Sequence, residues 1–292
     1  MFPSTTGRFQ LGAFPGASSR YAHNIANDNL LAAWESWQDA TLQGLVWQDL
    51  TGNGYDLVLD GDLARNGSSV TALFTDGNTV YLPGIDSETG DASTYLKLNA
   101  GGDSDLAEFS KNFSTGAFTP RERTYSIYMR HRKQGFSNFG DTTWLIGTRQ
   151  SSTNGVGGLM SLSHSTPGYN QLRGNVRVGS TPISAANVPA FSRYDMFEEF
   201  RVFTMTFTDN GNATWTAKIY VDGTEYVGSP IAEADFSSQP TSTWPLFTIS
   251  SIFGQYGGDM SVGASYVWDR ALTAGEVSSL ATQLSGKATT DF

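Results

Sequence analysis

Residues 259–277 read DMSVGASYVWDRALTAGEV, and this stretch decides the fold. Apolar and small side chains alternate with others up to Trp268, a pattern that is typical of a β-strand. A tight turn follows, and Thr273 and Glu276 then have the N-cap and N3 spacing of a capping box. In a capping box each side chain satisfies an unpaired amide at the start of a helix. The stretch therefore predicts a strand, a turn and a short capped helix.

Two other stretches place glycine turns between alternating runs. Residues 46–59 read VWQDLTGNGYDLVL, in which Gly-Asn-Gly supplies the positive-φ positions of a tight turn. Residues 215–225 read WTAKIYVDGTE, in which Asp-Gly predicts the two-residue turn of a hairpin. Further alternating runs cover residues 124–130 and 200–207. Short strands separated by turn signals in this way indicate a β-sandwich.

The three stretches stand in the same order as in laminin-G-like jelly rolls of the concanavalin A-like lectin and glucanase superfamily, which the chain resembles over residues 30–285. That family commonly opens with a strand, a Trp-x-Asp-x-Ser/Thr-Gly-Asn-Gly turn and another strand. The resemblance implies an all-β, concanavalin A-like jelly-roll β-sandwich with an N-terminal extended arm and a short C-terminal helix. Residues 30–37 fit a helix or a strand by periodicity alone, and the resemblance favours a strand.

The composition changes near residue 30. Residues 1–29 have little apolar periodicity and are rich in Gly, Ser, Pro and Ala. We interpret them as an arm that attaches the chain to other subunits of a protein assembly, and residues 30–292 as the laminin-G-like jelly-roll domain. A segment with so few core residues is ordered by packing on its own domain or on a neighbour. The sequence favours neither.

Composition argues against several functions. The 292 residues include 18 basic and 28 acidic side chains, and the net charge of −10 argues against binding nucleic acid or anionic lipid. There is no cysteine, which excludes disulfides and thiolate metal sites. No apolar stretch approaches the roughly 18 residues of a membrane helix, and no signal peptide is visible. We therefore expect a soluble protein, without membrane insertion, at a virion surface or outside the cell.

No group of residues predicts catalysis. Retaining glycosidases need two carboxyl groups about 5 Å apart. The nearest sequence pattern, around Glu233 and Asp235, lacks the third acid of the Glu-x-Asp-x-x-Glu glucanase motif. The histidines at positions 23, 131 and 164 stand in unrelated contexts, and no nucleophile elbow is present. The sequence thus predicts that the protein is not an enzyme, with no catalytic residue, metal site or cofactor.

Loop calcium is an alternative that the sequence leaves open, because Asp, Asn and carbonyl oxygens can all bind this ion. Two pairs of residues would contribute ligands: Asp49 with Asn53, and Asp103 with Asp105. Roles in Asx-type turns explain the same residues more simply and are favoured.

A basic cluster interrupts the acidic chain. Five of the 18 basic residues bracket the strand expected around Ile127: Arg121, Arg123, Arg130, Arg132 and Lys133. The favoured interpretation is a strand whose charged ends keep it soluble and prevent edge-to-edge pairing. The alternative is a docking patch for an acidic partner, either a protein subunit or a charged polysaccharide.

Loop aromatics are the candidate glycan-binding residues, because sugars place apolar C–H faces on aromatic rings. The candidates are Trp144, Tyr169 and Tyr256. In a chain that is 13% aromatic, core packing is the simpler interpretation of any single one.

The expected function is a non-enzymatic surface component of a virion or similar large assembly, such as a capsid decoration or tail-associated protein with glycan-binding capacity. Laminin-G-like domains do occur on phage particles, so the resemblance permits this function. The alternative is a free or cell-surface carbohydrate-binding module. A glycoside hydrolase is a third candidate, but the sequence lacks its acids.

Overall fold

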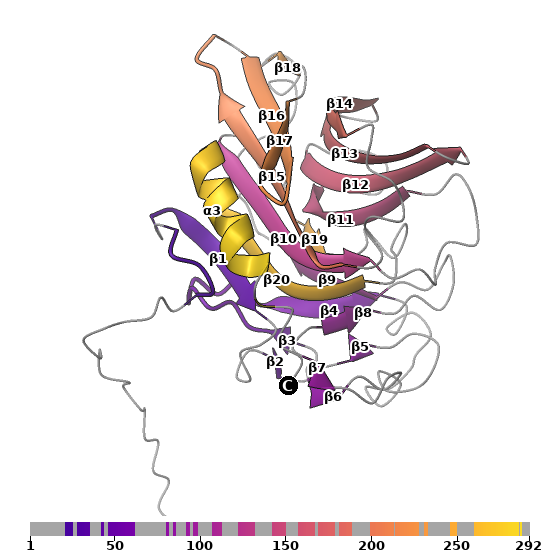
Figure 1. The fold of residues 1–292 in the computed structure, drawn as a ribbon, viewed down its shortest axis with the longest axis vertical. Coiled ribbons are helices and arrows are strands. Elements are labelled where there is room, and N and C mark those ends of the chain that lie inside the picture. The colour runs from indigo at the N-terminus through magenta and orange to yellow at the C-terminus, as the bar shows by residue number, and fades with distance from the viewer. Residues whose placement is uncertain are drawn as a thin grey trace, which may run out of the picture.

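The computed structural model describes residues 21–25, 28–35, 42–43, 46–61, 80–81, 84–85, 92–93, 96–98, 107–112, 122–131, 142–149, 157–166, 169–178, 181–188, 199–212, 214–227, 231–232, 246–249, 260–285 and 287. These residues form two large β-sheets that pack against one another, a small third sheet and a helix (Figure 1). Neighbouring strands within the large sheets are antiparallel. The all-β sandwich with a short C-terminal helix is therefore confirmed.

The first sheet contains the strand and hairpin expected from residues 259–277 and 215–225. Its spatial order is β17 (Thr224–Val227), β16 (Thr214–Val221), β15 (Arg201–Asp209), β10 (Arg123–His131), β20 (Met260–Trp268), β8 (Leu96–Leu98) and β5 (Val80–Tyr81). Two further strands join it at the side: β1 (Leu30–Glu35), which pairs with β20, and β18 (Ile231–Ala232), which pairs with β16.

The second sheet faces the first through contacts of β11 with β10 and of β13 and β14 with β16. Its order is β14 (Thr181–Val188), β13 (Tyr169–Val178), β12 (Gly157–Thr166), β11 (Thr142–Arg149), β19 (Leu246–Ile249), β9 (Ala107–Asn112), β4 (Leu57–Gly61), β3 (Val46–Trp47) and β2 (Leu42–Gln43). The small third sheet pairs β6 (Gly84–Ile85) with β7 (Ala92–Ser93).

The central strand β10 is buried on both faces. Alternation predicts one apolar face, which contains Tyr125, Ile127 and Met129, and these side chains are buried. The opposite face is buried as well, although it carries polar side chains. There the hydroxyl groups of Ser126 and Thr204 lie 2.8 Å apart and satisfy one another across the β10–β15 pair.

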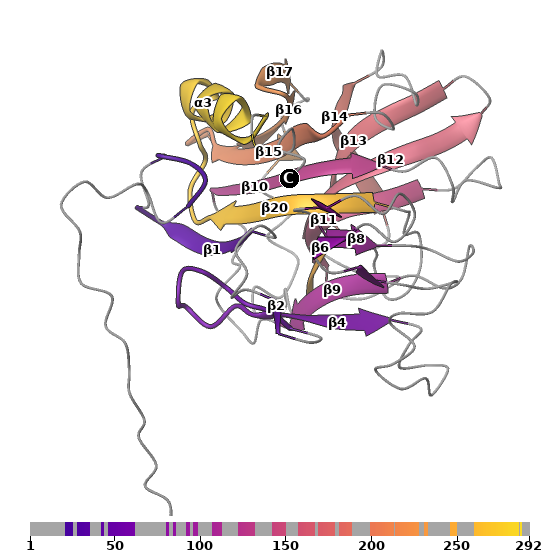
Figure 2. The ribbon, with the colours of Figure 1, turned by 60° about the horizontal axis from the view of Figure 1, so that its bottom comes forward.

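Helix α3 (Ala274–Ser285) covers this outer face of the first sheet, and Figure 2 shows it beside β15 and β10. It buries a stripe at helical spacing, which consists of Val277, Leu280, Ala281 and Leu284. The predicted two-residue turn at Asp222 and Gly223 is confirmed, with φ values of 49° and 82°. A Cβ on Gly223 would lie 2.9 Å from the Ser278 Cα, so this glycine lets the turn approach the helix closely.

The core begins before the predicted domain boundary at residue 30. Tyr21, His23 and Ile25 belong to the predicted arm, yet they are buried, and both Tyr21 and Ile25 join the core cluster under α3. These side chains are buried because they pack on segments far away in the sequence, and local periodicity does not predict such contacts. Residues 1–20 of the arm lie outside the described residues. The strand expected over residues 30–37 is observed as β1.

Candidate functional site

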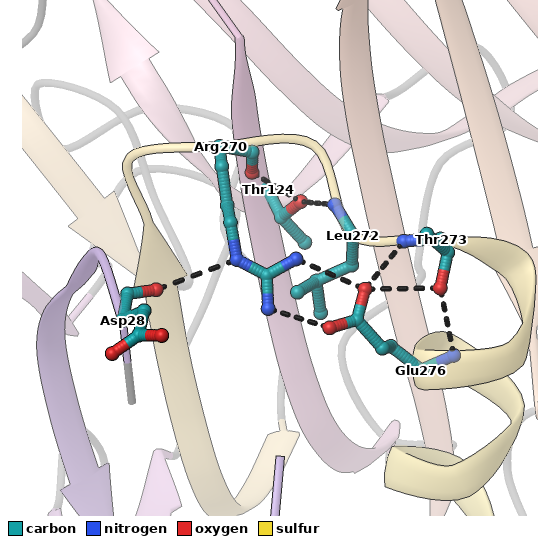
Figure 3. Close-up of polar contacts among 6 residues, drawn as sticks. All are labelled: Asp28, Thr124, Arg270, Leu272, Thr273 and Glu276. Carbon is teal, nitrogen blue, oxygen red and sulfur yellow. Dashed lines mark hydrogen bonds and ion pairs between the residues drawn. The ribbon is translucent and has the colours of Figure 1, made fainter. Parts of the chain in front are cut away.

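A polar network joins the N-terminal segment, β10 and the helix at the junction between β20 and α3 (Figure 3). The Arg270 guanidinium donates to both carboxylate oxygens of Glu276, with Nη1–Oε2 and Nη2–Oε1 distances of 2.9 and 2.6 Å. Its Nε also donates to the Asp28 carbonyl oxygen at 3.3 Å. A planar guanidinium matches a carboxylate in this two-bond geometry, which fixes orientation as well as charge. Arg270 thereby joins the N-terminal segment to the helix.

The predicted capping box is confirmed at the same junction. Thr273 N–H donates to Glu276 Oε2 at 2.8 Å, and Glu276 N–H donates back to Thr273 Oγ1 at 3.2 Å. The hydrogen bond from Arg270 is the main reason that the pKa of Glu276 falls to about 2, and the bonds from Thr273 add to it. Conversely, the Glu276 carboxylate raises the pKa of Arg270. Both charged groups are engaged by neighbours, so the junction stabilises the fold and offers no free acid or base.

Thr124 extends this junction to the central strand β10. Its Oγ1 donates to the Arg270 carbonyl oxygen and accepts from Leu272 N–H, both at 2.9 Å. One hydroxyl group therefore satisfies two backbone groups of the connection before α3, which would otherwise be buried without partners.

The Asp49 carboxylate organises the Gly-Asn-Gly turn. It accepts backbone N–H bonds from Ala33 at 3.1 Å, Thr51 at 3.0 Å and Tyr55 at 3.2 Å. It also accepts the Thr51 hydroxyl at 2.6 Å. Asp49 is 8% exposed. This geometry is an Asx-type turn, so the favoured sequence interpretation explains the residue without calcium.

The same turn covers the free edge of β1. Leu50 N–H donates to the Ala33 carbonyl oxygen at 2.8 Å, and Asn53 Nδ2 donates to the Leu31 carbonyl oxygen at 2.9 Å. The glycines on either side of Asn53 have φ values of 83° and 82°, as the positive-φ prediction requires. Satisfying these edge groups prevents another strand from pairing with β1. The Gly-Asn-Gly turn therefore protects the edge of β1.

A buried cluster of ionisable residues lies where residues 21–25 cross the outer face of the first sheet. Glu35 and His23 are 0% and 1% exposed. Glu35 Oε1 accepts from Ala22 N–H and from Tyr266 O–H, both at 2.7 Å. The His23 ring stacks on Tyr21, with centroids 5.5 Å apart, and meets the Tyr266 ring edge-on at 4.7 Å.

Burial shifts the pKa values in this cluster. It lowers the pKa of His23 from 6.5 to about 4, because the imidazolium would lose its hydration. It also raises the pKa of Tyr266 well above its ordinary value, and the Glu35 carboxylate adds to that shift. A histidine, a carboxylate and a phenol resemble an acid–base set. No substrate can reach groups that are this deeply buried, so the cluster is not a catalytic site. Sequence reasoning missed it, because its members come from segments far apart in the chain.

The predicted basic patch loses one member. Arg123 is 3% exposed and lies 2.8 Å from the Asp269 carboxylate, so its guanidinium cannot meet a partner protein. Arg130 lies with its guanidinium carbon 5.3 Å from the centroid of the Phe200 ring, a cation–π contact. The other predicted docking residues, Arg121, Arg132 and Lys133, lie outside the described residues.

Two of the three candidate glycan-binding residues lie in the second sheet. Trp144 is in β11 and pairs with Ser161, whereas Tyr169 is in β13 and pairs with Thr166. Strand β12 separates them. Tyr256 lies outside the described residues.

The other candidate acids and metal ligands give no site within the described part of the chain. Glu199, an exposed acid whose sequence neighbour Glu198 would point to the opposite face of a strand, pairs with Arg201 at 3.3 Å. Glu233, Asp235, Asp103 and Asp105 fall outside the described residues. Within the described ranges, no group of three His, Asp or Glu side chains is placed to hold a metal ion. The helix described there is also too short to cross a membrane.

No protein-family model matches the chain, and no curated protein sequence does. Solved structures do match. A Trypanosoma rangeli sialidase in complex with 2,3-difluorosialic acid superposes with a TM-score of 0.53 at 15% identity, over 89% of this chain and 33% of that one. The binding domain of botulinum neurotoxin DC in complex with rat synaptotagmin II gives a TM-score of 0.57 at 14% identity, over 89% of this chain and 52% of that one.

A third match is botulinum neurotoxin type C, which enters cells in a way dependent upon interaction with two ganglioside molecules. Its TM-score is 0.52 at 13% identity, over 88% of this chain and 52% of that one. The chain therefore spans between a third and about half of these structures. At such low identity the likeness shows a shared β-sandwich fold.

Proposed function

We propose that this chain is a non-enzymatic carbohydrate-binding domain of the laminin-G-like type, carried at the surface of a larger assembly. The observation that supports it most is the fold match over 88% of the chain to botulinum neurotoxin type C, whose cell entry depends upon interaction with two ganglioside molecules and which points to glycans as the ligand class. The botulinum neurotoxin DC binding domain, matched in complex with rat synaptotagmin II, shares the fold over 89% of the chain. Both likenesses lie at identities where fold alone is shared, so the proposal needs its own test.

The glycan site that we propose is on the second sheet. The outer face of the central strands β10, β15 and β20 is covered by α3 and residues 21–25, and the inner face of the first sheet meets the second sheet. These central strands therefore have no open face for a ligand. The second sheet holds Trp144 and Tyr169, whose rings could each stack against a sugar. We include Tyr256 as the third binding residue.

The sialidase match raises hydrolysis as an alternative. Within the described residues, the buried carboxylate Glu35 and the paired carboxylate Glu276 each have internal partners, and they belong to separate clusters. Glu35 and Glu276 therefore do not form the facing pair of carboxyl groups that glycoside hydrolysis ordinarily uses, whereas Asp60 and Glu108 are register partners across β4 and β9. We therefore propose binding without turnover, and expect no release of sialic acid from sialylated oligosaccharides.

The arm supplies the attachment in this proposal. Residues 21–25 dock on the domain, so residues 1–20 precede a fixed anchor point. We propose that residues 1–20 bind other subunits of a virion or a comparable extracellular particle. Deleting residues 1–20 should leave a folded domain that binds glycan but no longer joins its particle, and normal incorporation would contradict this part of the proposal.

The binding proposal is tested with a panel of sialylated and neutral glycans and three single variants, Trp144→Ala, Tyr169→Ala and Tyr256→Ala. Stacked aromatic pairs contribute about 0.5–1.5 kcal/mol beyond the area that they bury, and we expect a ring stacked on a sugar to contribute on the same scale, so each variant should weaken binding by about two- to twelvefold. Tyr226→Ala, on β17 of the first sheet, is the matched aromatic control and should bind normally. Unchanged binding in all three variants would exclude the second sheet as the site.

A further inference from the structure

Residues 21–25 form a strap, here called the N-terminal strap, across the outer face of the first sheet. It is held by a small number of directed contacts in addition to its apolar packing. Ala22 N–H donates to Glu35 Oε1 at 2.7 Å. Asn24 N–H donates to Gln283 Oε1 at 2.7 Å, and Gln283 Nε2 donates back to Asn24 Oδ1 at 2.8 Å. These contacts are side-chain bonds to β1 and α3, so the strap is not part of a β-ladder and can open without breaking one.

The imidazole of His23 occupies the centre of the strap's interface. It is 1% exposed and lies among the rings of Tyr21, Tyr266 and Trp268, at centroid distances of 5.5, 4.7 and 5.5 Å. Three aromatic rings form an apolar enclosure in which a neutral imidazole packs well. A charged imidazole there would lose most of its hydration.

Several elements that pack near the N-terminal strap carry ionisable groups. β1 supplies Glu35, and β20 supplies Tyr266, whose hydroxyl donates to Glu35. The buried face of α3 is entirely apolar. The same core cluster holds three other ionisable side chains, all of them tyrosines: Tyr21 from the strap, Tyr128 from β10 and Tyr220 from β16. Glu35 accepts bonds from the strap backbone and from Tyr266.

We propose that the N-terminal strap is an acid-released tether, in which protonation of His23 undocks residues 21–25 from the first sheet while the two-sheet sandwich remains folded. This inference does not depend on glycan binding. Burial lowers the pKa of His23 to about 4, whereas the imidazole of a released strap regains the ordinary value of 6.5, so acidification favours the released strap. Release frees residues 21–27 up to Asp28, whose carbonyl oxygen stays bonded to Arg270, and these residues span up to roughly 25 Å in extended form. Acid would therefore lengthen the link between the domain and whatever residues 1–20 hold.

Hydrogen exchange on the full chain tests the proposal. The amides of Ala22 and Asn24 report on the strap, and the Val277 amide, which donates to the Thr273 carbonyl oxygen at 3.0 Å, reports on α3. Protection of the two strap amides, corrected for intrinsic exchange, should fall about tenfold per pH unit between about pH 6.5 and 4, roughly 300-fold in all. Protection of Val277 should remain well above that of the two strap amides throughout this range, because α3 stays folded when the strap opens. Equal protection at all three amides would mean that the strap opens only by global unfolding and would overturn the proposal.

His23→Phe is the decisive variant, because phenylalanine keeps an aromatic ring in the enclosure but cannot be protonated. Its strap protection should be independent of pH. Glu35→Gln keeps a carbonyl acceptor for Ala22 N–H and removes the carboxylate, and it should retain the pH dependence of the unaltered chain. If His23→Phe opens with acid as the unaltered chain does, the trigger is another group and the proposal fails.

A direct titration keeps the proposal testable if His23→Phe does not fold. The His23 ring signals, assigned by their loss in His23→Gln, should titrate near pH 4 in the otherwise unaltered chain. Titration near pH 6.5 with the strap amides still protected would show that the charged ring is tolerated in place, and would contradict the tether.

Discussion

Replacing Asp49 by alanine tests whether the Gly-Asn-Gly turn is held by hydrogen bonds alone. The carboxylate accepts from Ala33, Thr51 and Tyr55 N–H and from the Thr51 hydroxyl. Hydrogen bonds to a charged group contribute about 1.5–3 kcal/mol each, but bonds to one carboxylate are not additive. Ala33 is 0% exposed, so its N–H would be left buried without its partner. We expect the free energy of unfolding to fall by about 3–5 kcal/mol.

The assay is urea unfolding of the full chain and of Asp49→Ala, each in excess EDTA and in excess calcium. The loss of stability should be the same in both conditions. Asp209→Ala is the matched control: this exposed aspartate accepts Gly211 N–H at 2.8 Å, and removing it should lower stability by about 1 kcal/mol or less. If calcium stabilises the unaltered chain but not Asp49→Ala, the turn binds a cation and the account of its carboxylate is refuted.

Three further predictions concern the helix and the strap. Glu276→Gln should lower the free energy of unfolding by about 1–3 kcal/mol at neutral pH. Because Arg270 lowers the pKa of Glu276 to about 2, the unaltered chain should lose the same stability as the pH falls from 4.5 toward 2. Chemical denaturation of both chains across that pH range checks this prediction. If the unfolding free energies of the unaltered chain and of Glu276→Gln depend on pH in the same way, the prediction is wrong. Gly223→Ala should cost about 2–3 kcal/mol in the same assay, because its Cβ would lie 2.9 Å from the Ser278 Cα; no loss would show that the turn can shift. Finally, the unfolded chain binds more protons at His23 between pH 6.5 and 4, so the free energy of unfolding should fall by at most about 3.4 kcal/mol as the pH is lowered through that range, and His23→Phe should abolish this dependence.

Local signals in the sequence found the features whose cause is local. The capping box at Thr273 and Glu276 depends on residues three apart, and both of its bonds are present. The turn at Asp222 and Gly223 depends on two adjacent positive-φ residues, which are also present. A short sequence pattern is sufficient to predict such caps and turns, because they do not depend on tertiary contacts.

Features that depend on packing between distant segments could not be predicted. Arg123 was one of five basic residues near a strand, and its burial beside Asp269 follows from the pairing of β10 with β20. Ser126 looks like a surface position by alternation, but α3 and residues 21–25 cover that face, and Thr204 supplies its partner. His23 stands in a segment poor in apolar residues, and its aromatic neighbours from β20 come more than 240 positions later.

Chemical-shift mapping of the isotope-labelled full chain with a sialylated oligosaccharide and a neutral one tests the central proposal most directly. We predict saturable shifts in β11 and β13 around Trp144 and Tyr169, with no change at Arg270 or Glu276 in the β20–α3 junction. Shifts confined to that junction, or none with any glycan that the panel contains, would contradict a carbohydrate-binding domain that uses its second sheet.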